Sequence, residues 1–121
     1  MLAVDTSVFV DFLRNGDHIL AQELHAANVL SHPFVIGEIA LGLLRNRDEV
    51  LGLLAALPKA VVASDDEVMA FIERFSLFGR GIGYVDAHLL ASARLSGSML
   101  WTRDKRLKSA AEELSLAADL A

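Results

Sequence analysis

The chain has no cysteine, and only two prolines, one tryptophan and one tyrosine occur in its 121 residues. Without thiols it can form neither a disulfide nor a thiolate metal site, which suits a reducing cytoplasm. No apolar run approaches the roughly 20 residues that a transmembrane helix needs, and the run that begins at Leu2 already ends at Asp5. We therefore expect neither a membrane-spanning helix nor a signal peptide.

Apolar residues are abundant instead. They make up 54% of the sequence, which is high for a soluble protein of this length. The length suits one domain with its own core, so we expect residues 1–121 to form a single domain. Part of the apolar surplus is expected to face a partner.

The formal net charge of −5 argues against a nucleic-acid partner, because phosphate binding relies on lysine and arginine. The basic residues are nevertheless concentrated, since Arg103, Lys105 and Arg106 surround Asp104. Such a run is either a solvated helix face or a surface that contacts phosphates. The sequence leaves both interpretations open.

Short apolar segments alternate with helical patterns along the chain. The expected strands are Leu2 to Val4, Asn28 to Ser31, Ala60 to Ala63 and Met99 to Thr102, with a weak fifth near Leu116. Strands that alternate with helices predict a parallel sheet covered on both faces, and therefore an α/β fold. The helix that begins at Pro33 is almost wholly apolar and is expected to run to about Leu44.

Four acids are each isolated among apolar residues. They are Asp5 in LAVDTSVFV, Glu38 in FVIGEIALGLL, Asp86 in GYVDAHLLASA and Asp104 in MLWTRDKRL. A carboxylate buried alone is costly, so it takes up a proton or finds a partner, and no basic residue is embedded in comparable surroundings. Oxygen ligands without cysteine or a close histidine pair favour Mg²⁺ or Mn²⁺ over Zn²⁺.

Each acid also has a purely structural explanation. Asp5, Asp86 and Asp104 are possible helix N-caps, and Glu38 can pair with Arg45 at a helix surface. Against this, ligands of open α/β sheets bind outside the carboxyl ends of the strands, where three of these acids are expected. The four acids together favour a common site.

The four motifs, in this order, resemble those of the PIN-domain ribonucleases, specifically the small VapC-type toxins of bacterial toxin–antitoxin pairs. The resemblance spans nearly the whole chain. It implies a three-layer α/β/α sandwich around a central parallel sheet of four to five strands. It also implies a Mg²⁺-dependent endoribonuclease, with Mn²⁺ as a possible substitute, in which Asp5, Glu38, Asp86 and Asp104 are catalytic and hold the metal.

By the same resemblance the partners are an RNA substrate, a small antitoxin and a second copy of the chain in a homodimer. Relatives often carry another acid or amide just after the fourth acidic position, where this chain has Lys105 and Arg106. Whether one or two ions bind therefore stays open. We expect Arg103, Lys105 and Arg106 to contact the RNA.

Two other functions have to be weighed. A phosphorylatable receiver domain has a similar length and binds Mg²⁺, but it needs a pair of acids after its first strand, where Asp5 stands alone. It also needs an acceptor aspartate after its third strand, where Asp65 and Asp66 lie in an expected capping box. The other alternative is a PIN fold that has lost its activity and only binds partners, which the presence of all four acids disfavours.

Several other residues have weaker signals. The segment Gly79-x-Gly81-x-Gly83 lacks the context of a dinucleotide fingerprint and is expected to be a hinge or substrate loop. The histidines share no ligand spacing, and most are expected at the surface or at caps; His88 has a small chance of a role near the scissile phosphate. Thr6 and Ser7 are expected to cap a helix or to support the site.

The helices from Pro33 to Leu57 carry more leucine and valine than one core face can use. We expect an apolar groove between them and the first helix, at Val8, Phe9 and Phe12, to receive the antitoxin. A homodimer interface is the equally weighted alternative for part of this surface.

Overall fold

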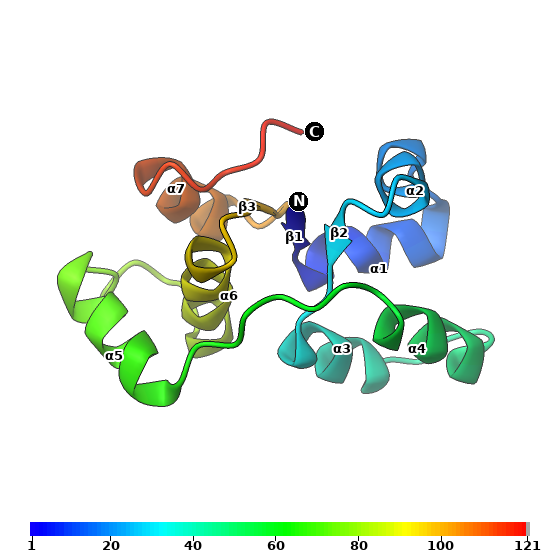
Figure 1. The fold of residues 1–121 in the computed structure, drawn as a ribbon, viewed down its shortest axis with the longest axis horizontal. Helices are drawn as coiled ribbons and strands as arrows, with labels where there is room; N and C mark the ends of the chain where they lie inside the picture. The colour runs from blue at the N-terminus through cyan, green and yellow to red at the C-terminus, as the bar shows by residue number, and fades with distance from the viewer. Residues whose placement is uncertain (121) are drawn as a thin grey trace.

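A short parallel sheet lies between two groups of helices in the computed structural model, which describes residues 1–120 (Figure 1). The strands are β1 (Leu2–Val4), β2 (Val29–Leu30) and β3 (Met99–Trp101), in the spatial order β2-β1-β3. Leu2 of β1 pairs with both Val29 and Met99, so the central strand is β1. The expected α/β fold with a parallel sheet is confirmed.

Helices cover both faces of the sheet across residues 1–120, with α1 to α4 on one side and α5 to α7 on the other (Figure 1). The helices are α1 (Thr6–Asn15), α2 (His18–His25), α3 (Pro33–Ala40), α4 (Arg47–Ala55), α5 (Asp65–Arg74), α6 (Tyr84–Leu95) and α7 (Lys105–Glu113). No helix in this part of the chain is long and apolar enough to cross a membrane.

Several helices begin where a side chain caps them, as expected from the sequence. Asp17 accepts hydrogen bonds from the backbone N–H groups of Ile19 and Leu20 at the start of α2. Ser64 and Glu67 form the expected reciprocal capping box at the start of α5. Because such bonds satisfy N–H groups that lack helical partners, they fix where each helix begins.

The expectation of four to five strands is not confirmed. In the described residues, the segments near Ala60 and Leu116 contribute only single parallel bridges, Ser31 to Lys59 and Leu100 to Ala117. The backbone of Val61 bonds instead to α6, because its N–H donates to Ser96 Oγ and its carbonyl accepts from Ser92 Oγ. These side chains take the place of a strand partner.

The apolar helix from Pro33 is also shorter than expected, because α3 ends at Ala40 rather than near Leu44. The Arg47 guanidinium donates two hydrogen bonds, of 3.3 and 2.9 Å, to the carbonyl oxygen of Ala40. This cap satisfies a free carbonyl at the end of α3. Asn46 then adopts a left-handed conformation (φ 51°), and α4 begins at the next residue.

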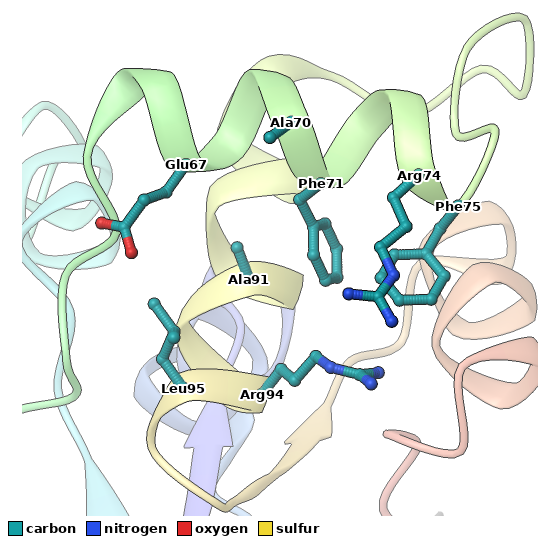
Figure 2. Close-up of a pocket in the computed structure, with 8 residues that line it drawn as sticks. All are labelled: Glu67, Ala70, Phe71, Arg74, Phe75, Ala91, Arg94 and Leu95. Atoms are coloured by element: carbon teal, nitrogen blue, oxygen red, sulfur yellow. The ribbon is translucent and has the colours of Figure 1, made fainter.

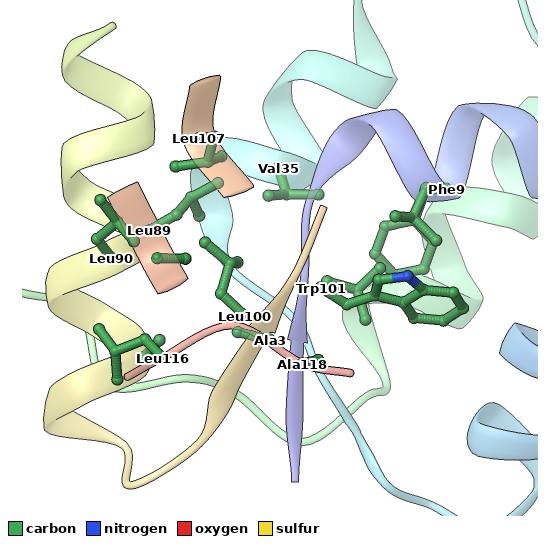
Figure 3. Close-up of a cluster of buried hydrophobic side chains, with 14 of the residues drawn as sticks. Ala3, Phe9, Val35, Leu89, Leu90, Leu100, Trp101, Leu107, Leu116 and Ala118 are labelled. Atoms are coloured by element: carbon green, nitrogen blue, oxygen red, sulfur yellow. The ribbon is translucent and has the colours of Figure 1, made fainter. Parts of the chain in front are cut away.

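The core lies on both faces of the sheet (Figure 3). Neighbouring residues of β3 point to opposite faces, so Leu100 packs toward Leu89 and Leu90 of α6 while Trp101 lies beside Phe9 of α1 (Figure 3). All five side chains are almost completely buried. This packing holds α1 and α6, which carry candidate site residues, against opposite faces of the same short sheet.

Candidate active site

The carboxyl ends of β1 and β3 bring together residues that are far apart in the sequence. Asp5 directly follows β1, while Thr102 and Asp104 follow β3. The backbone N–H of Asp5 donates to the carbonyl oxygen of Trp101 at 2.9 Å, which ties the two strand ends to each other. This edge of a parallel sheet is where α/β proteins bind their ligands.

Asp5 is buried, with 7% of its surface exposed. It occupies the N-cap position of α1, but its side chain accepts no capping hydrogen bond. Instead Oδ2 accepts two bonds of 2.7 Å, from Ser7 Oγ and from Thr102 Oγ1. The interpretation of Asp5 as a capping residue is therefore wrong, and two hydroxyl groups hold its carboxylate in one orientation.

Asp86 lies in the first turn of α6, and its Oδ2 accepts a hydrogen bond of 3.0 Å from the backbone N–H of Gly83. Partial burial raises the pKa of Asp86, because it disfavours the charged form, and the bond from Gly83 opposes this effect. The negative charges of Asp5, Asp104 and Glu38 raise the pKa further. Asp5, Asp104 and Glu38 thus each lie within electrostatic range of Asp86.

Glu38 and Asp104 are exposed and differ in their contacts. Glu38 Oε1 accepts a hydrogen bond of 2.8 Å from Thr6 Oγ1, and no pairing of Glu38 with Arg45 occurs in the described residues. Asp104 caps α7, since its Oδ1 accepts from the N–H groups of Arg106 and Leu107 at 3.0 Å each. The capping interpretation is correct for Asp104, and its Oδ2 takes no part in the cap.

The donor chemistry of this site fits a hard divalent cation, because every candidate ligand atom is a carboxylate oxygen. Within residues 1–120 no three acids or histidines are already gathered into a metal-binding group. Mg²⁺ does not require such a cage, since it commonly keeps several waters and uses only one or two carboxylates. Hydrogen bonds restrict the orientations of the Asp5 and Asp86 carboxylates.

The three basic residues expected to contact RNA have different environments. Arg103 forms ion pairs with Asp11, at 2.8 Å, and with Asp17, and its guanidinium lies 5.5 Å from the centre of the Trp101 ring. The hydrogen bond from Arg103 is the main cause of a lowered pKa at Asp17. Arg103 therefore links the start of α7 to α1 and α2, while Lys105 and Arg106 are exposed beside Asp104.

The loop from Gly79 to Gly83 contacts Arg106. Gly81 has φ +76°, and a Cβ built on it would lie 2.6 Å from an Nη atom of Arg106. A side chain at this position is thus disfavoured both by the backbone conformation and by the close approach of the guanidinium. The loop thus packs against Arg106 of α7 at Gly81 and bonds to Asp86 of α6 at Gly83.

The expectation that most histidines lie at the surface or at caps is confirmed, since His18 and His25 are exposed and His32 is a cap, although His32 and His88 are buried. His32 caps α3 through Nδ1, which accepts from the N–H of Phe34, and burial followed by repulsion from His88 lowers its pKa to about 4. His88 Nε2 lies 3.2 Å from Asp65 Oδ1, which also accepts from Tyr84 Oη. These contacts join α5 to the start of α6.

Sequence reasoning missed Thr102, which orients Asp5, and did not assign specific partners to Thr6 and Ser7. A hydroxyl residue beside an isolated acid is the available signal, as in DTS and TRD, but the signal is weak. Ser and Thr at such positions usually serve as caps. Only the pairing of β1 with β3 reveals that Thr102 and Asp5 meet.

An apolar groove lies between α1, α2 and α4. It is lined by Phe9, Phe12, Leu13, Leu24, Val50, Leu53, Leu54 and Leu57. The expectation is met for the first helix and for α4 of the helix pair, but α3 does not line the groove, and α2 takes its place. Val8, which the sequence placed in this groove, is fully buried in the core. Leu41 and Leu43, with exposed fractions of 90% and 105%, form a separate apolar surface after α3.

Residues 2–113 match the sequence profile of the PIN domain family. Ribonuclease VapC32 of Mycobacterium tuberculosis, from strains CDC 1551 / Oshkosh and ATCC 25618 / H37Rv, is 48% identical over 118 residues, which cover 97% of this chain and 95% of the relative.

Two solved structures have the same fold. FitAcB from Neisseria gonorrhoeae superposes with a TM-score of 0.62 at 22% identity, covering 93% of this chain and 94% of that one. PAE2754 from Pyrobaculum aerophilum gives 0.60 at 19% identity, covering 93% and 85%. Family profile, relatives and fold agree with the resemblance in the four acidic motifs, and the chain belongs to the PIN domain family.

Proposed function

We propose that this protein is a metal-dependent endoribonuclease that acts as the toxin of a toxin–antitoxin pair. The proposal is supported by the PIN domain match over residues 2–113 and by the placement of Asp5 and Asp104 directly after the adjacent strands β1 and β3; besides burial, the charges of Asp5, Asp104 and Glu38 raise the pKa of Asp86. A cluster of like charges opposes folding, so it is expected at a site with a chemical role. The close relative named Ribonuclease VapC32 supports the assignment of RNA as substrate.

Asp5 and Asp86 hold the ion in this proposal, and Glu38 and Asp104 complete the site. Ser7 and Thr102 both donate to Oδ2 of Asp5, which holds the carboxylate in place and leaves Oδ1 available to a ligand. Thr6 does the same for Glu38. A bound Mg²⁺ or Mn²⁺ supplies charge neutralisation at the phosphate and lowers the pKa of the attacking water.

Lys105 and Arg106 are the proposed RNA contacts, because both are exposed next to Asp104. Arg103 contributes to the same surface mainly by holding the start of α7 in place through Asp11 and Asp17. The acids thus lie next to exposed basic residues. In this proposal one phosphate of the RNA lies at the acids, and neighbouring phosphates contact Lys105 and Arg106.

The apolar groove between α1, α2 and α4 is the proposed docking site of the antitoxin, and the surface around Leu41 and Leu43 is the proposed homodimer contact. The groove is lined by apolar side chains of which Leu53 is 65% exposed, and Leu41 and Leu43 are almost fully exposed. A groove of this kind fits the apolar face of an amphipathic helix.

Cleavage of RNA by the purified chain tests the nuclease directly. We expect cleavage with Mg²⁺ or Mn²⁺, none with EDTA, and poor support by Ca²⁺, whose longer bonds and looser geometry position the reacting groups badly. Asp86→Asn is the inactive control. Undiminished cleavage after exhaustive chelation would refute the metal mechanism, and the absence of cleavage under all conditions would favour an inactive PIN fold.

The receiver alternative has no support in the described residues. Asp65 is engaged by Tyr84 and His88, and its neighbour Glu67 belongs to the capping box of α5. Labelling by acetyl phosphate at Asp65 or Asp66 is not expected.

A further inference from the structure

A second hollow lies between α5 and α6, away from the acidic site (Figure 2). It has a volume of about 270 Å³. Its lining combines apolar side chains, among them Phe71, Ala91 and Leu95, with Arg74 and Arg94 at one end and Glu67 at the other (Figure 2). The hollow is therefore apolar in the middle and oppositely charged at its two ends.

Arg74 and Arg94 come from different helices and converge on one aromatic ring. Their guanidinium carbons lie 5.3 and 4.9 Å from the centre of the Phe75 ring. Within residues 1–120 neither arginine forms an ion pair with a carboxylate. The Phe75 ring stabilises the two guanidinium charges only weakly, because a cation–π contact at an exposed site contributes about 0.5–1 kcal/mol.

Arg74 and Arg94 are distinguished by their position, because two cationic groups from different helices meet at one ring beside an apolar hollow. The other arginine of this region, Arg80, already forms a bidentate ion pair with Glu113. Arg74 and Arg94 thus retain the capacity to bind an anion, and they point toward each other around Phe75 beside the apolar hollow (Figure 2).

We infer that this hollow docks a peptide segment of a partner protein, in which an apolar side chain enters the hollow and one or two adjacent carboxylates pair with Arg74 and Arg94. Guanidinium groups bind carboxylates through paired hydrogen bonds, which gives such a segment a fixed direction. Phe71, Ala91 and Leu95 supply the surface for the apolar side chain. The positive charge of the two arginines thus complements the carboxylates of the segment, and the apolar lining of the hollow complements its apolar side chain.

A peptide fits this surface better than RNA does. The Phe75 ring is already in contact with two guanidinium groups, so it offers little free face on which a base can stack. The carboxylate of Glu67 lies at the other end of the hollow and would repel a phosphate chain that followed it. A peptide chain can instead present a neutral or basic residue to Glu67.

The hollow is spatially separate from the acidic site. Arg94 follows Asp86 by eight residues on α6, which corresponds to roughly 12 Å along the helix axis. The inference rests on residues outside the acidic site and does not depend on the nuclease assignment.

A titration followed by ¹⁵N–¹H correlation spectra of the whole chain tests the inference. The probe is the capped peptide acetyl-Leu-Glu-Glu-Phe-amide, and its matched control carries glutamine in place of both glutamates. We expect saturable shifts of resonances around Phe71, Arg74 and Arg94 with the acidic peptide. The glutamine peptide should bind at least about tenfold more weakly, because it lacks the charge-assisted bonds.

Two double variants distinguish binding at Arg74 and Arg94 from a general attraction between the acidic peptide and the positive charges of the protein. The double substitution Arg74→Gln with Arg94→Gln should weaken binding of the acidic peptide by at least about tenfold. The control, Lys59→Gln with Lys108→Gln, removes the same charge from exposed positions elsewhere and should leave binding unchanged. All four positions are exposed, so dispersed spectra are expected from both folded variants.

Three results would overturn the inference. One is the absence of saturable shifts at millimolar acidic peptide, and another is equal affinity for the two peptides. The third is displacement of the peptide by an oligouridylate that shifts the same resonances, since this would assign the hollow to nucleic acid.

Discussion

Thr102 Oγ1 donates a hydrogen bond of 2.7 Å to Asp5 Oδ2, although the two residues are 97 positions apart in the sequence. The bond joins the ends of β1 and β3 and lies at the point where the candidate metal ligands converge. Ser7 Oγ donates to the same oxygen and lies 3.4 Å from Thr102 Oγ1. The orientation of Asp5 is thus determined by hydroxyl groups from two different segments.

Thr102→Val should weaken metal binding and cleavage by about 10–100-fold, since a residue that orients a metal ligand commonly has an effect of this size. The loss of one hydrogen bond to a charged group should also lower the free energy of unfolding by about 1–3 kcal/mol. Mn²⁺ affinity measured by electron paramagnetic resonance checks the first effect. Ser98→Ala removes another buried hydroxyl, far from the site, and should not change Mn²⁺ affinity.

Asp86→Asn should abolish cleavage while raising stability at neutral pH in the absence of metal. The pKa of Asp86 is raised in the folded protein, so the charged form opposes folding. The amide oxygen of asparagine can still accept the hydrogen bond from Gly83. Melting temperatures should therefore be higher for the variant at pH 7, and cleavage should fall by more than about 100-fold.

The sign of this effect predicts its pH dependence. The charged form of Asp86 lowers the free energy of unfolding of the wild type. This destabilisation is complete above the raised pKa of Asp86 and disappears as the pH falls below the ordinary value of 3.8. The difference in melting temperature between Asp86→Asn and wild type should therefore shrink with acidification. Asp66→Asn, at an exposed position on α5, should show no such stabilisation; equal behaviour of the two variants would contradict the role of the cluster.

Arg103 should matter for stability more than for RNA binding. Arg103→Gln removes two ion pairs and is expected to lower the free energy of unfolding by about 1–2 kcal/mol at pH 7. Because Arg103 lowers the pKa of Asp17, this contribution is present above the ordinary carboxyl pKa and is lost as the pH falls through the lowered value. Urea unfolding of wild type and variant at pH 7 measures the loss of stability, and the same experiment at acid pH measures how far that loss disappears.

The matched variants are Lys105→Gln and Arg106→Gln. Each should reduce the salt dependence of RNA binding by roughly one unit if it contacts one phosphate, with stability changed by less than about 0.5 kcal/mol. An unchanged slope in the double variant would mean that this basic surface is only solvated.

Gly81→Ala should lower the free energy of unfolding by about 1 kcal/mol, because an L-residue is strained at φ +76°. The contact with Arg106 is less important, since the end of a flexible side chain can move away. The double variant with Arg106→Ala should therefore recover little of the loss. Thermal unfolding of the two variants checks this, and full recovery would assign the effect to the steric contact instead.

Leu53→Glu should weaken binding of the cognate antitoxin by at least about tenfold, because it places a charge in the apolar groove between α1, α2 and α4. Leu53 is 65% exposed, so the fold should tolerate the change. Leu43→Glu, at a fully exposed position outside the groove, is the control. Calorimetric titration with unchanged affinity for the Leu53 variant would place the antitoxin elsewhere.

The sequence alone was sufficient for features with short-range causes. The caps at Asp17 and Ser64 follow from side chains that bond to N–H groups two or three residues ahead. The four acids were recognisable because each is isolated among apolar residues in the sequence, but the burial that makes a carboxylate costly holds only for Asp5 and in part for Asp86, since Glu38 and Asp104 are exposed. The alternation of strands and helices predicted the α/β fold for the same local reasons.

The tertiary structure decided what depends on distant partners. Asp5 does not cap α1, the structural alternative to its expected role in the site, because its carboxylate accepts from Thr102 and Ser7 instead. Arg103 forms ion pairs with Asp11 and Asp17. The segment at Val61 failed to form a strand because serines of α6 satisfy its backbone. Such pairings depend on the geometry of packed elements, which no local pattern of residues encodes.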